Sequence, residues 1–231
     1  PADAILDWEN ESKDYSTINL FGQYILDHYG RSVIAAMIGN NKVGVESFNE
    51  ALRAFGFSEG FSEVFKDWAL AALINDCSVE LRNKYCYNNP LLTYDNFHIQ
   101  FNIVEGSGKS IASQTTTKDW RADWLKLEKK LEATKPSEHI FMLQFLGQSG
   151  SNFSVPYVVY GEDSKTILKI SAMALKEGVG TFFVEEFGYK VPKVVIIPYN
   201  QTQISGTNGK APSVSYTFNA STIDEATRAT H

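Results

Sequence analysis

Two glycine- and serine-rich segments contain residue types found in catalytic and nucleotide-binding loops. Gly147-Gln-Ser-Gly-Ser151 is like a nucleophile elbow, but the closing glycine is replaced by serine and apparent strands lie on both sides, whereas an elbow needs a strand-to-helix turn. Gly106-Ser-Gly-Lys-Ser110 copies the end of a phosphate-binding loop, yet Ile103 stands where that pattern requires glycine. The residues that follow Ser110 are a poor opening for a helix, which phosphate binding needs. We therefore expect two surface loops, without serine-hydrolase or nucleotide-binding activity.

The histidines and cysteines offer few metal ligands at useful spacing. The four histidines are single and widely separated: His28, His98, His139 and His231. No pair has the spacing of a zinc site, so we expect no metal ligand among them. Cys77 and Cys86 are too far apart for a CxxC hook, and no second pair is present. They form either a small disulfide loop, as expected in an extracellular protein, or two buried free thiols.

Charge and hydropathy exclude several classes of partner. The formal net charge is −6 and no basic tract is present, so nucleic acid and anionic membranes are poor partners. No apolar run approaches the roughly 20 residues that span a bilayer. A chain of 231 residues with 43% hydrophobic content can form one large domain or two small ones with their own cores.

Apolar residues recur at helical spacing through the first part of the chain, which predicts a helical subdomain over residues 1–90. The expected helices cover residues 12–30, 32–38 and 45–55, and a fourth begins with Ser62 as its N-cap. Glu63 would lie in the first turn of this fourth helix, where its negative charge stabilises the helix dipole.

From residue 91 to 231 the pattern changes to alternation, which predicts an antiparallel β-sandwich, with residues 91–115 as a linker. The expected strands cover residues 97–104, 140–146, 155–160, 166–170, 181–184, 194–198 and 214–218. The apolar spacing of residues 120–127 suits a helix or a strand. The polar tail after Asn219 is expected to be frayed. The predicted fold class is therefore α+β, a helical subdomain followed by a sandwich.

Three segments carry a resemblance to a known family. They are Asp14-Tyr-Ser-Thr-Ile-Asn-Leu-Phe-Gly-Gln-Tyr-Ile-Leu-Asp-His-Tyr-Gly30, Phe61-Ser-Glu-Val-Phe-Lys-Asp-Trp-Ala-Leu-Ala-Ala-Leu-Ile-Asn-Asp76 and Lys84-Tyr-Cys-Tyr-Asn-Asn-Pro90. The second resembles the helical segment that follows the active-site helix in secreted gluzincin-type zinc metallopeptidases of the hyicolysin-like and immune-inhibitor-A-like groups. The first resembles the helix that precedes that segment. The β part matches only loosely, and there the resemblance favours a strand over residues 120–127.

These enzymes carry His-Glu-x-x-His, but no histidine of this chain is followed by glutamate. The resemblance thus implies the downstream part of an extracellular zinc endopeptidase that acts on peptides or proteins. Zinc would belong to the parent enzyme, held by an N-terminal metal-binding half, and this chain would have no cofactor and no activity by itself. Tyr15 would supply a hydroxyl to the oxyanion beside the zinc. The alternative role for Tyr15 is capping or packing.

A second hypothesis comes from another functional class. The chain would be a non-enzymatic extracellular binding module whose sandwich recognises carbohydrate or protein. Trp120 and Trp124 would support this hypothesis if they were exposed on one sheet face, because aromatic rings stack well on sugars.

Overall fold

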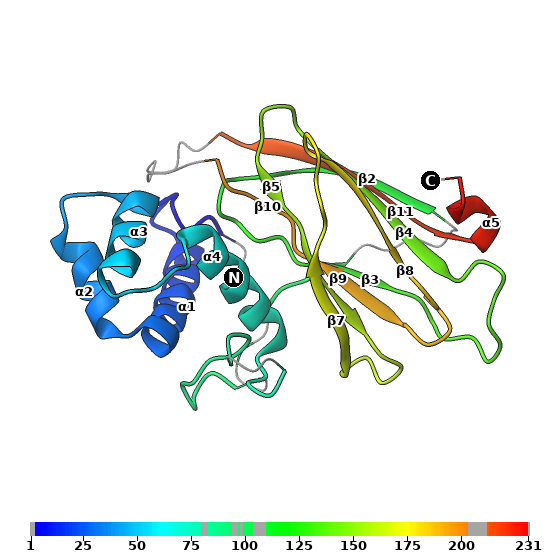
Figure 1. Cartoon of the computed structure of the whole chain (residues 1–231), viewed down its shortest axis with the longest axis horizontal. Helices are drawn as coiled ribbons and strands as arrows, with labels where there is room; N and C mark the ends of the chain where they lie inside the picture. The colour runs from blue at the N-terminus through cyan, green and yellow to red at the C-terminus, as the bar shows by residue number, and fades with distance from the viewer. Residues whose placement is uncertain are drawn as a thin grey trace. The chain divides into compact units, whose positions relative to one another are not determined.

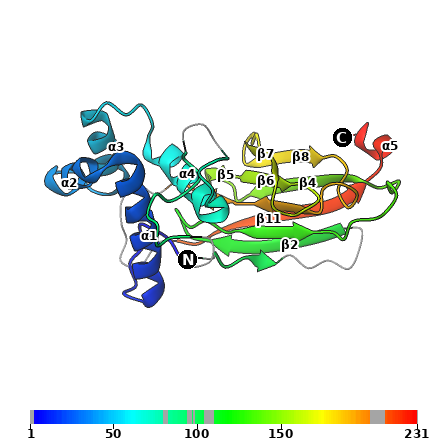
Figure 2. The ribbon, with the colours of Figure 1, turned by 90° about the horizontal axis from the view of Figure 1, so that it is seen from below.

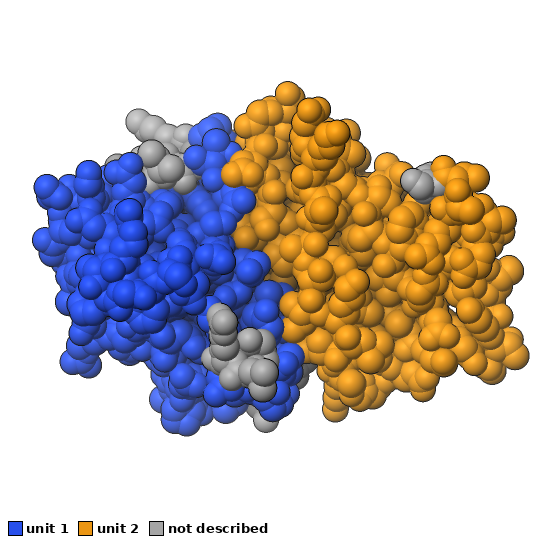
Figure 3. Space-filling model, viewed as in Figure 1, with its two compact units in different colours: residues 1–100, 118–122, 201–212 blue, residues 101–117, 123–200, 213–231 orange. Residues whose placement is uncertain are grey.

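The computed structural model describes residues 3–79, 83–93, 97, 99–103, 110–202 and 212–230. The chain divides into two compact units (Figure 3). The helical unit comprises residues 1–100, 118–122 and 201–212, and the β unit comprises residues 101–117, 123–200 and 213–231. Among the described residues, no helix is both long and apolar enough to span a membrane.

The described part of the helical unit contains four helices (Figure 1). They are α1 (Ser12–Tyr29), α2 (Arg31–Gly39), α3 (Gly44–Ala54) and α4 (Phe61–Ile74). All four predicted helices are thereby confirmed. Their apolar faces meet in an aromatic core, in which the Phe21 ring lies 5.4 Å from the Trp68 ring and 5.8 Å from the Phe61 ring, both in edge-to-face geometry. Aromatic pairs of this kind stabilise a core beyond the apolar area that they bury.

The start of α4 differs from the prediction. The N-cap is Gly60 and not Ser62, because Glu63 reaches back to accept a hydrogen bond from the Gly60 backbone N–H at 3.3 Å. Ser62 instead directs its hydroxyl to the side chain of Gln201. Glu63 lies in the first turn of α4, as predicted, where a carboxylate is favourable against the helix dipole.

A disulfide joins Cys77 to Cys86 after the end of α4, so the first of the two cysteine hypotheses is confirmed. The α4 helix ends at Ile74, and its C-cap Asn75 adopts the left-handed conformation at φ 44°. The Asn75 side chain donates to the carbonyl of Leu92 at 2.7 Å and accepts from the backbone N–H of Tyr87 at 3.1 Å. A disulfide of this kind is typical of an exported protein.

The β unit contains two main sheets, which confirms the predicted α+β class with a sandwich (Figures 1 and 2). Its elements are β1 (Asn102–Ile103), β2 (Ser110–Thr117), β3 (Leu125–Glu128), β4 (Ile140–Gly147), β5 (Phe153–Ser154), β6 (Pro156–Tyr160), β7 (Ile167–Ala172), β8 (Val179–Val184), β9 (Lys193–Ile196), β10 (Tyr199–Asn200), β11 (Val214–Ile223) and the short helix α5 (Glu225–Arg228). One sheet has the order β1-β3-β9-β6-β7 and the other β2-β11-β4-β8, while β5 and β10 form a small pair. The β1–β3 pairing is parallel and the others are antiparallel.

The core of the β unit lies between the two main sheets. Alternate residues of β3, β4, β6, β8, β9 and β11 point into it, as the period of two along a strand requires. From the first sheet come Leu125, Val194 and Ile196, and from the second come Phe141, Leu143 and Phe218, all buried. The opposite, outward face of the second sheet carries the residues that form the candidate site.

Several predicted strand limits are wrong. Within 97–104 the described strand is only β1, and residues 110–115, part of the suggested linker, lie in β2. Within 120–127 the strand starts at Leu125, because Trp120 has a left-handed backbone at φ 55° that cannot continue a strand. The tail after Asn219 is ordered, since β11 continues to Ile223 and α5 follows.

Candidate functional site

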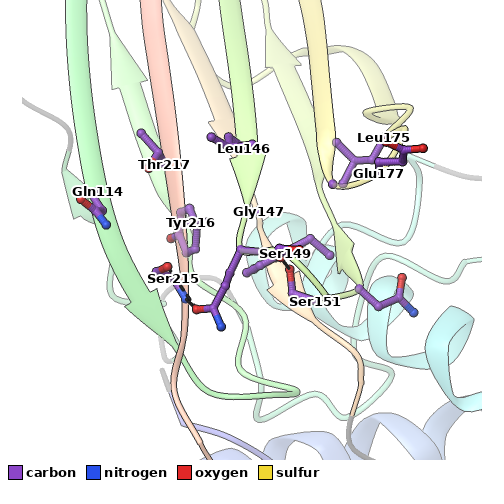
Figure 4. A pocket seen from close by; sticks show the side chains of 15 residues that line it. Gln114, Leu146, Gly147, Ser149, Ser151, Leu175, Glu177, Ser215, Tyr216 and Thr217 are labelled. Atoms are coloured by element: carbon purple, nitrogen blue, oxygen red, sulfur yellow. Dashed lines mark hydrogen bonds between the residues drawn. The ribbon is translucent and has the colours of Figure 1, made fainter.

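The candidate site is a pocket of about 890 Å³ in the β unit, at one end of the β2-β11-β4-β8 sheet (Figure 4). The loop between β4 and β5, residues 148–152, forms one wall. Gly147 permits this loop to fold back, because a Cβ at Gly147 would lie only 2.6 Å from the Phe153 ring. The β7–β8 turn forms another wall, and Glu177 and Gly178 at its tip both have positive φ, at 53° and 80°. Positive φ at both central residues is the requirement of a two-residue hairpin turn of type I′.

The strand register brings polar side chains from separate parts of the chain into one row. Thr217 of β11 pairs with Gln114 of β2 on one side and with Leu146 of β4 on the other. Figure 4 shows these three residues side by side across the sheet, above Ser215. Leu146 is 52% exposed and contributes an apolar patch to the otherwise polar row.

Gln148 fixes the loop to β11. Its backbone N–H donates to the carbonyl of Ser215 at 2.9 Å, and its Oε1 accepts from the Ser215 backbone N–H at 3.0 Å and from the Ser215 hydroxyl at 3.2 Å. Because a backbone N–H requires an acceptor, this contact determines which amide atom of Gln148 is oxygen. The amide nitrogen of Gln148 is then a donor on an exposed side chain at the pocket.

An aromatic floor supports the pocket from the core. The rings of Phe145, Phe153 and Tyr216 have their centroids 5.3 to 5.5 Å apart. Tyr216 is 1% exposed and donates its hydroxyl to the buried Asp123 carboxylate at 3.2 Å. These rings therefore hold the floor in place and present no face on which a ligand could stack.

The lining is mostly uncharged and polar. Its described members are amides, hydroxyls, glycines and a few apolar groups, and Glu177 is the single charged one among them. Ser149 and Ser151 have no histidine beside them in this lining, and Ser149 lies in a loop between strands, so a nucleophile elbow is absent from this loop. Glycoside hydrolysis ordinarily requires two carboxylates, which this lining lacks.

Tyr15, the residue selected from the sequence for catalysis, lies in the helical unit, in the first turns of α1. Its side chain is 49% exposed, and its hydroxyl donates to Asn10 Oδ1 at 2.9 Å. The Trp8 ring packs edge-to-face against it at 4.9 Å. Asp14, the neighbour of Tyr15, is buried and accepts from the backbone N–H groups of Glu9 and Glu11 at 3.0 and 2.9 Å.

Other residues singled out from the sequence have structural positions or lie outside the described residues. His28 Nε2 lies 2.9 Å from the carbonyl oxygen of Cys86. His98, His231 and residues 106–109 of the phosphate-loop-like segment are outside the described ranges. Trp120 and Trp124 are 3% and 1% exposed, so the proposed aromatic platform for sugars is wrong. Both indole side chains are buried as hydrophobic core residues.

Only the Gly147–Ser151 loop of the pocket was singled out from the sequence, and the strand residues of the lining were not recognised. Gln114, Ser215 and Thr217 stand among other serines and threonines in the strand-like segments, and nothing in their spacing marks them. The only available signal was alternation: polar residues at every second position predict an outward sheet face.

Comparisons with known proteins add little to this geometry. No family model and no curated protein matches the chain. Similar solved structures include a periplasmic inhibitor of g-type lysozyme from Aeromonas hydrophila, 10% identical, with a TM-score of 0.32 over 52% of this chain and 92% of that one. The pre-peptidase C-terminal domain of a collagenase from Bacillus anthracis is 9% identical, with a TM-score of 0.34 over 52% and 94%. The Yersinia pseudotuberculosis-derived mitogen is 7% identical, with a TM-score of 0.32 over 50% and 87%. Such low scores carry no argument about function.

Proposed function

We propose that the chain belongs to an exported protein and that its β unit binds a neutral, hydroxyl-rich ligand, a carbohydrate, in the pocket at the end of the β2-β11-β4-β8 sheet. The observation that carries this proposal is the composition of the lining, in which uncharged hydrogen-bonding groups predominate. The Cys77–Cys86 disulfide supports export. No catalytic step is assigned to this pocket.

Hydrogen bonding would select the ligand. The Gln114 amide and the Thr217 hydroxyl can each donate and accept hydrogen bonds at the pocket, and the Gln148 amide nitrogen can donate. Sugar hydroxyls likewise donate and accept. Each such bond contributes about 0.5–1.5 kcal/mol, so several together are needed for useful affinity. Leu146, 52% exposed, would cover the C–H face of a sugar ring, because the aromatic floor is buried.

The test is a titration of the isotope-labelled chain with a panel of neutral oligosaccharides, followed by NMR and calorimetry. We expect the resonances of Gln114, Gln148 and Thr217 to shift. Thr217→Val keeps the side-chain shape but removes the hydroxyl, and should weaken binding by about tenfold. Thr181→Val is the matched control, since Thr181 lies on β8 of the same sheet but outside the pocket lining.

Two results would overturn the carbohydrate proposal. One is that no neutral sugar shifts the pocket resonances; the other is that Thr181→Val weakens binding as much as Thr217→Val. A peptide that alone shifts these resonances would keep the pocket as a binding site but would assign it to protein recognition.

A second proposed function follows from the resemblance of residues 5–90 to secreted zinc metallopeptidases. The chain would then be the downstream part of an extracellular zinc endopeptidase, with zinc held by a separate N-terminal metal-binding half and a peptide or protein as substrate. What supports this proposal beyond the motifs is the position of Tyr15, whose hydroxyl is held at the surface by Asn10. An exposed, oriented hydroxyl is what stabilisation of an oxyanion needs.

The endopeptidase proposal is tested in the protein produced from the whole coding sequence, with zinc and a fluorogenic peptide. Tyr15→Phe should lower kcat by about a hundredfold. Asn10→Ala should lower it less, because the hydroxyl would remain but lose its partner. Tyr189→Phe, in the β unit, should have no effect. Absence of proteolysis, or an unchanged kcat in Tyr15→Phe, would reject the assigned role.

A further inference from the structure

Three residues from distant parts of the β unit meet at one end of the β2-β11-β4-β8 sheet. His139 immediately precedes β4, Glu185 immediately follows β8, and Glu225 opens α5 after β11. The register explains the meeting, because Ile140 of β4 pairs with Ile223 of β11 and Phe141 of β4 pairs with Val184 of β8. One ligand-type atom from each of His139, Glu185 and Glu225 lies within 4.8 Å of the other two.

The His139 ring is buried and its tautomer is determined. Its Nδ1 lies 3.0 Å from the carbonyl oxygen of Pro136 and 3.2 Å from that of Ser137. Carbonyl oxygens only accept, so Nδ1 carries the hydrogen and the neutral ring has a bare lone pair on Nε2. A backbone carbonyl that binds one ring nitrogen is also the usual support for a histidine whose other nitrogen holds a metal. The backbone of His139 is fixed as well, since its carbonyl accepts from Phe187 N–H at 2.7 Å.

The Nε2 atom of His139 has no hydrogen-bond partner among the described residues, although it is closed off from solvent. The His139 side chain is 7% exposed. Its Nε2 faces Glu225 Oε1 at 3.8 Å, so in the neutral form of the ring two electron-rich atoms point toward one another. A buried nitrogen without a partner is costly, and a cation between these two atoms would remove that cost.

Arg228 supplies part of the positive charge at this point. Its guanidinium forms an ion pair with Glu185 and lies 4.0 Å from Glu225 Oε2. It is partly exposed and pairs with the two carboxylates, so the His139 nitrogen is left without a partner among the described residues. A divalent cation would neutralise both carboxylates and satisfy the imidazole at once.

We propose that His139 Nε2, Glu185 and Glu225 bind a divalent transition-metal ion, zinc, with water completing the coordination. Imidazole with carboxylates is a donor set that zinc accepts. Ligand atoms of a tetrahedral zinc site lie roughly 3.4 Å apart, at metal distances of about 2.0–2.2 Å. The present donors need only small movements, which the exposed carboxylates can make by rotation while His139 stays fixed. Arg228 then releases Glu185.

The experiment uses the untagged 231-residue chain after dialysis against a weak chelator. Calorimetric titration with zinc should give one tight site per chain, and long-range ¹H–¹⁵N spectra should show the Nε2 resonance of one histidine, His139, changing on zinc addition. Glu185→Gln and Glu225→Gln should each weaken binding by about tenfold or more. Arg228→Gln should strengthen binding, because it removes the competing cation.

Controls separate this site from other ligands in the chain. Glu162→Gln changes an exposed glutamate elsewhere in the β unit, and His28→Gln changes a histidine of the helical unit; neither should alter zinc affinity. His139→Gln should abolish the site, but this residue is buried, so the exposed glutamate variants decide the matter if it fails to fold. The proposal would be overturned if the His139 resonances did not change on zinc addition. It would also be overturned if both glutamate variants bound zinc with the affinity of the wild type.

Discussion

The Nε2 atom of His28, in the last turn of α1, lies 2.9 Å from the carbonyl oxygen of Cys86. Tyr24, one turn earlier on the same face of α1, donates its hydroxyl to the carbonyl of Lys84 at 3.0 Å. Asp27 accepts from the backbone N–H of Asn88 at 2.7 Å. One end of α1 therefore holds the disulfide segment in place by side-chain contacts to its backbone.

Reduction of the Cys77–Cys86 disulfide should destabilise the helical unit. The two cysteines are 9 residues apart, and a loop of this size restricts the unfolded chain by roughly 2–3 kcal/mol. The measurement is denaturant unfolding, monitored by the helical circular dichroism signal, with and without reductant. A chain with both cysteines changed to serine should match the reduced protein. An equal midpoint with and without reductant would contradict the expectation.

Tyr24→Phe should lower the free energy of unfolding by about 1 kcal/mol, because it leaves the partly buried Lys84 carbonyl without the donor that the buried Tyr24 supplies. The matched control is Tyr15→Phe. Tyr15 is 49% exposed, so water replaces its bond to Asn10 and stability should not change. Equal effects of the two variants would show that the Tyr24 bond does not stabilise the fold.

Asp3 should make the helical unit more stable in mild acid. Burial, followed by a hydrogen bond with the Asp14 carboxyl, raises the pKa of Asp3 from 3.8 to about 6. A group with a raised folded-state pKa contributes stability that is full below its unfolded pKa and is lost as pH rises through the folded one. Its contribution therefore disappears between about pH 4 and pH 6. The pKa of Asp14 is lowered, chiefly by the hydrogen bond with Asp3, so its own contribution is constant above this window.

The check is the unfolding midpoint of Asp3→Asn at about pH 5 and about pH 7.5. The variant should lose part of the pH dependence of the wild type and gain stability at the higher pH. Asp163→Asn is the control: hydrogen bonds from Thr166 and Lys165 lower the pKa of Asp163 to about 2, so its ionisation is constant over this range. A wild-type pH dependence in Asp3→Asn would refute the assignment.

Gly147→Ala should damage the candidate pocket. The added Cβ would lie 2.6 Å from Phe153 Cδ2, and overpacking of this kind costs roughly 1–3 kcal/mol. Displacement of Phe153 should also shift the β4–β5 loop and weaken ligand binding. Gly22→Ala gives the contrast: its Cβ meets nothing within 4 Å inside α1, so it should stabilise by about 0.5–1 kcal/mol. A fully stable Gly147→Ala would mean that Phe153 moves freely.

Sequence patterns were sufficient wherever the controlling interactions are local. The four helices follow from apolar residues at helical spacing, and most strands follow from alternation. The two cysteines allowed either a disulfide or two free thiols, and the structure selects the disulfide. The predicted N-cap of α4, Ser62, was wrong. Serine and glycine both suit an N-cap, and the hydrogen bond from Gly60 N–H to Glu63 selects Gly60.

Tertiary structure alone decided which residues meet. Trp120 and Trp124 suit an exposed platform or a core equally well by type, and only packing buries them. Gln114 and Thr217 are neighbours because β11 pairs with β2 over a long sequence separation. His139, Glu185 and Glu225 likewise converge only through the register of β4 with β8 and β11. A one-residue change of register would turn every side chain of a strand to the other face, and no local pattern specifies that long-range pairing.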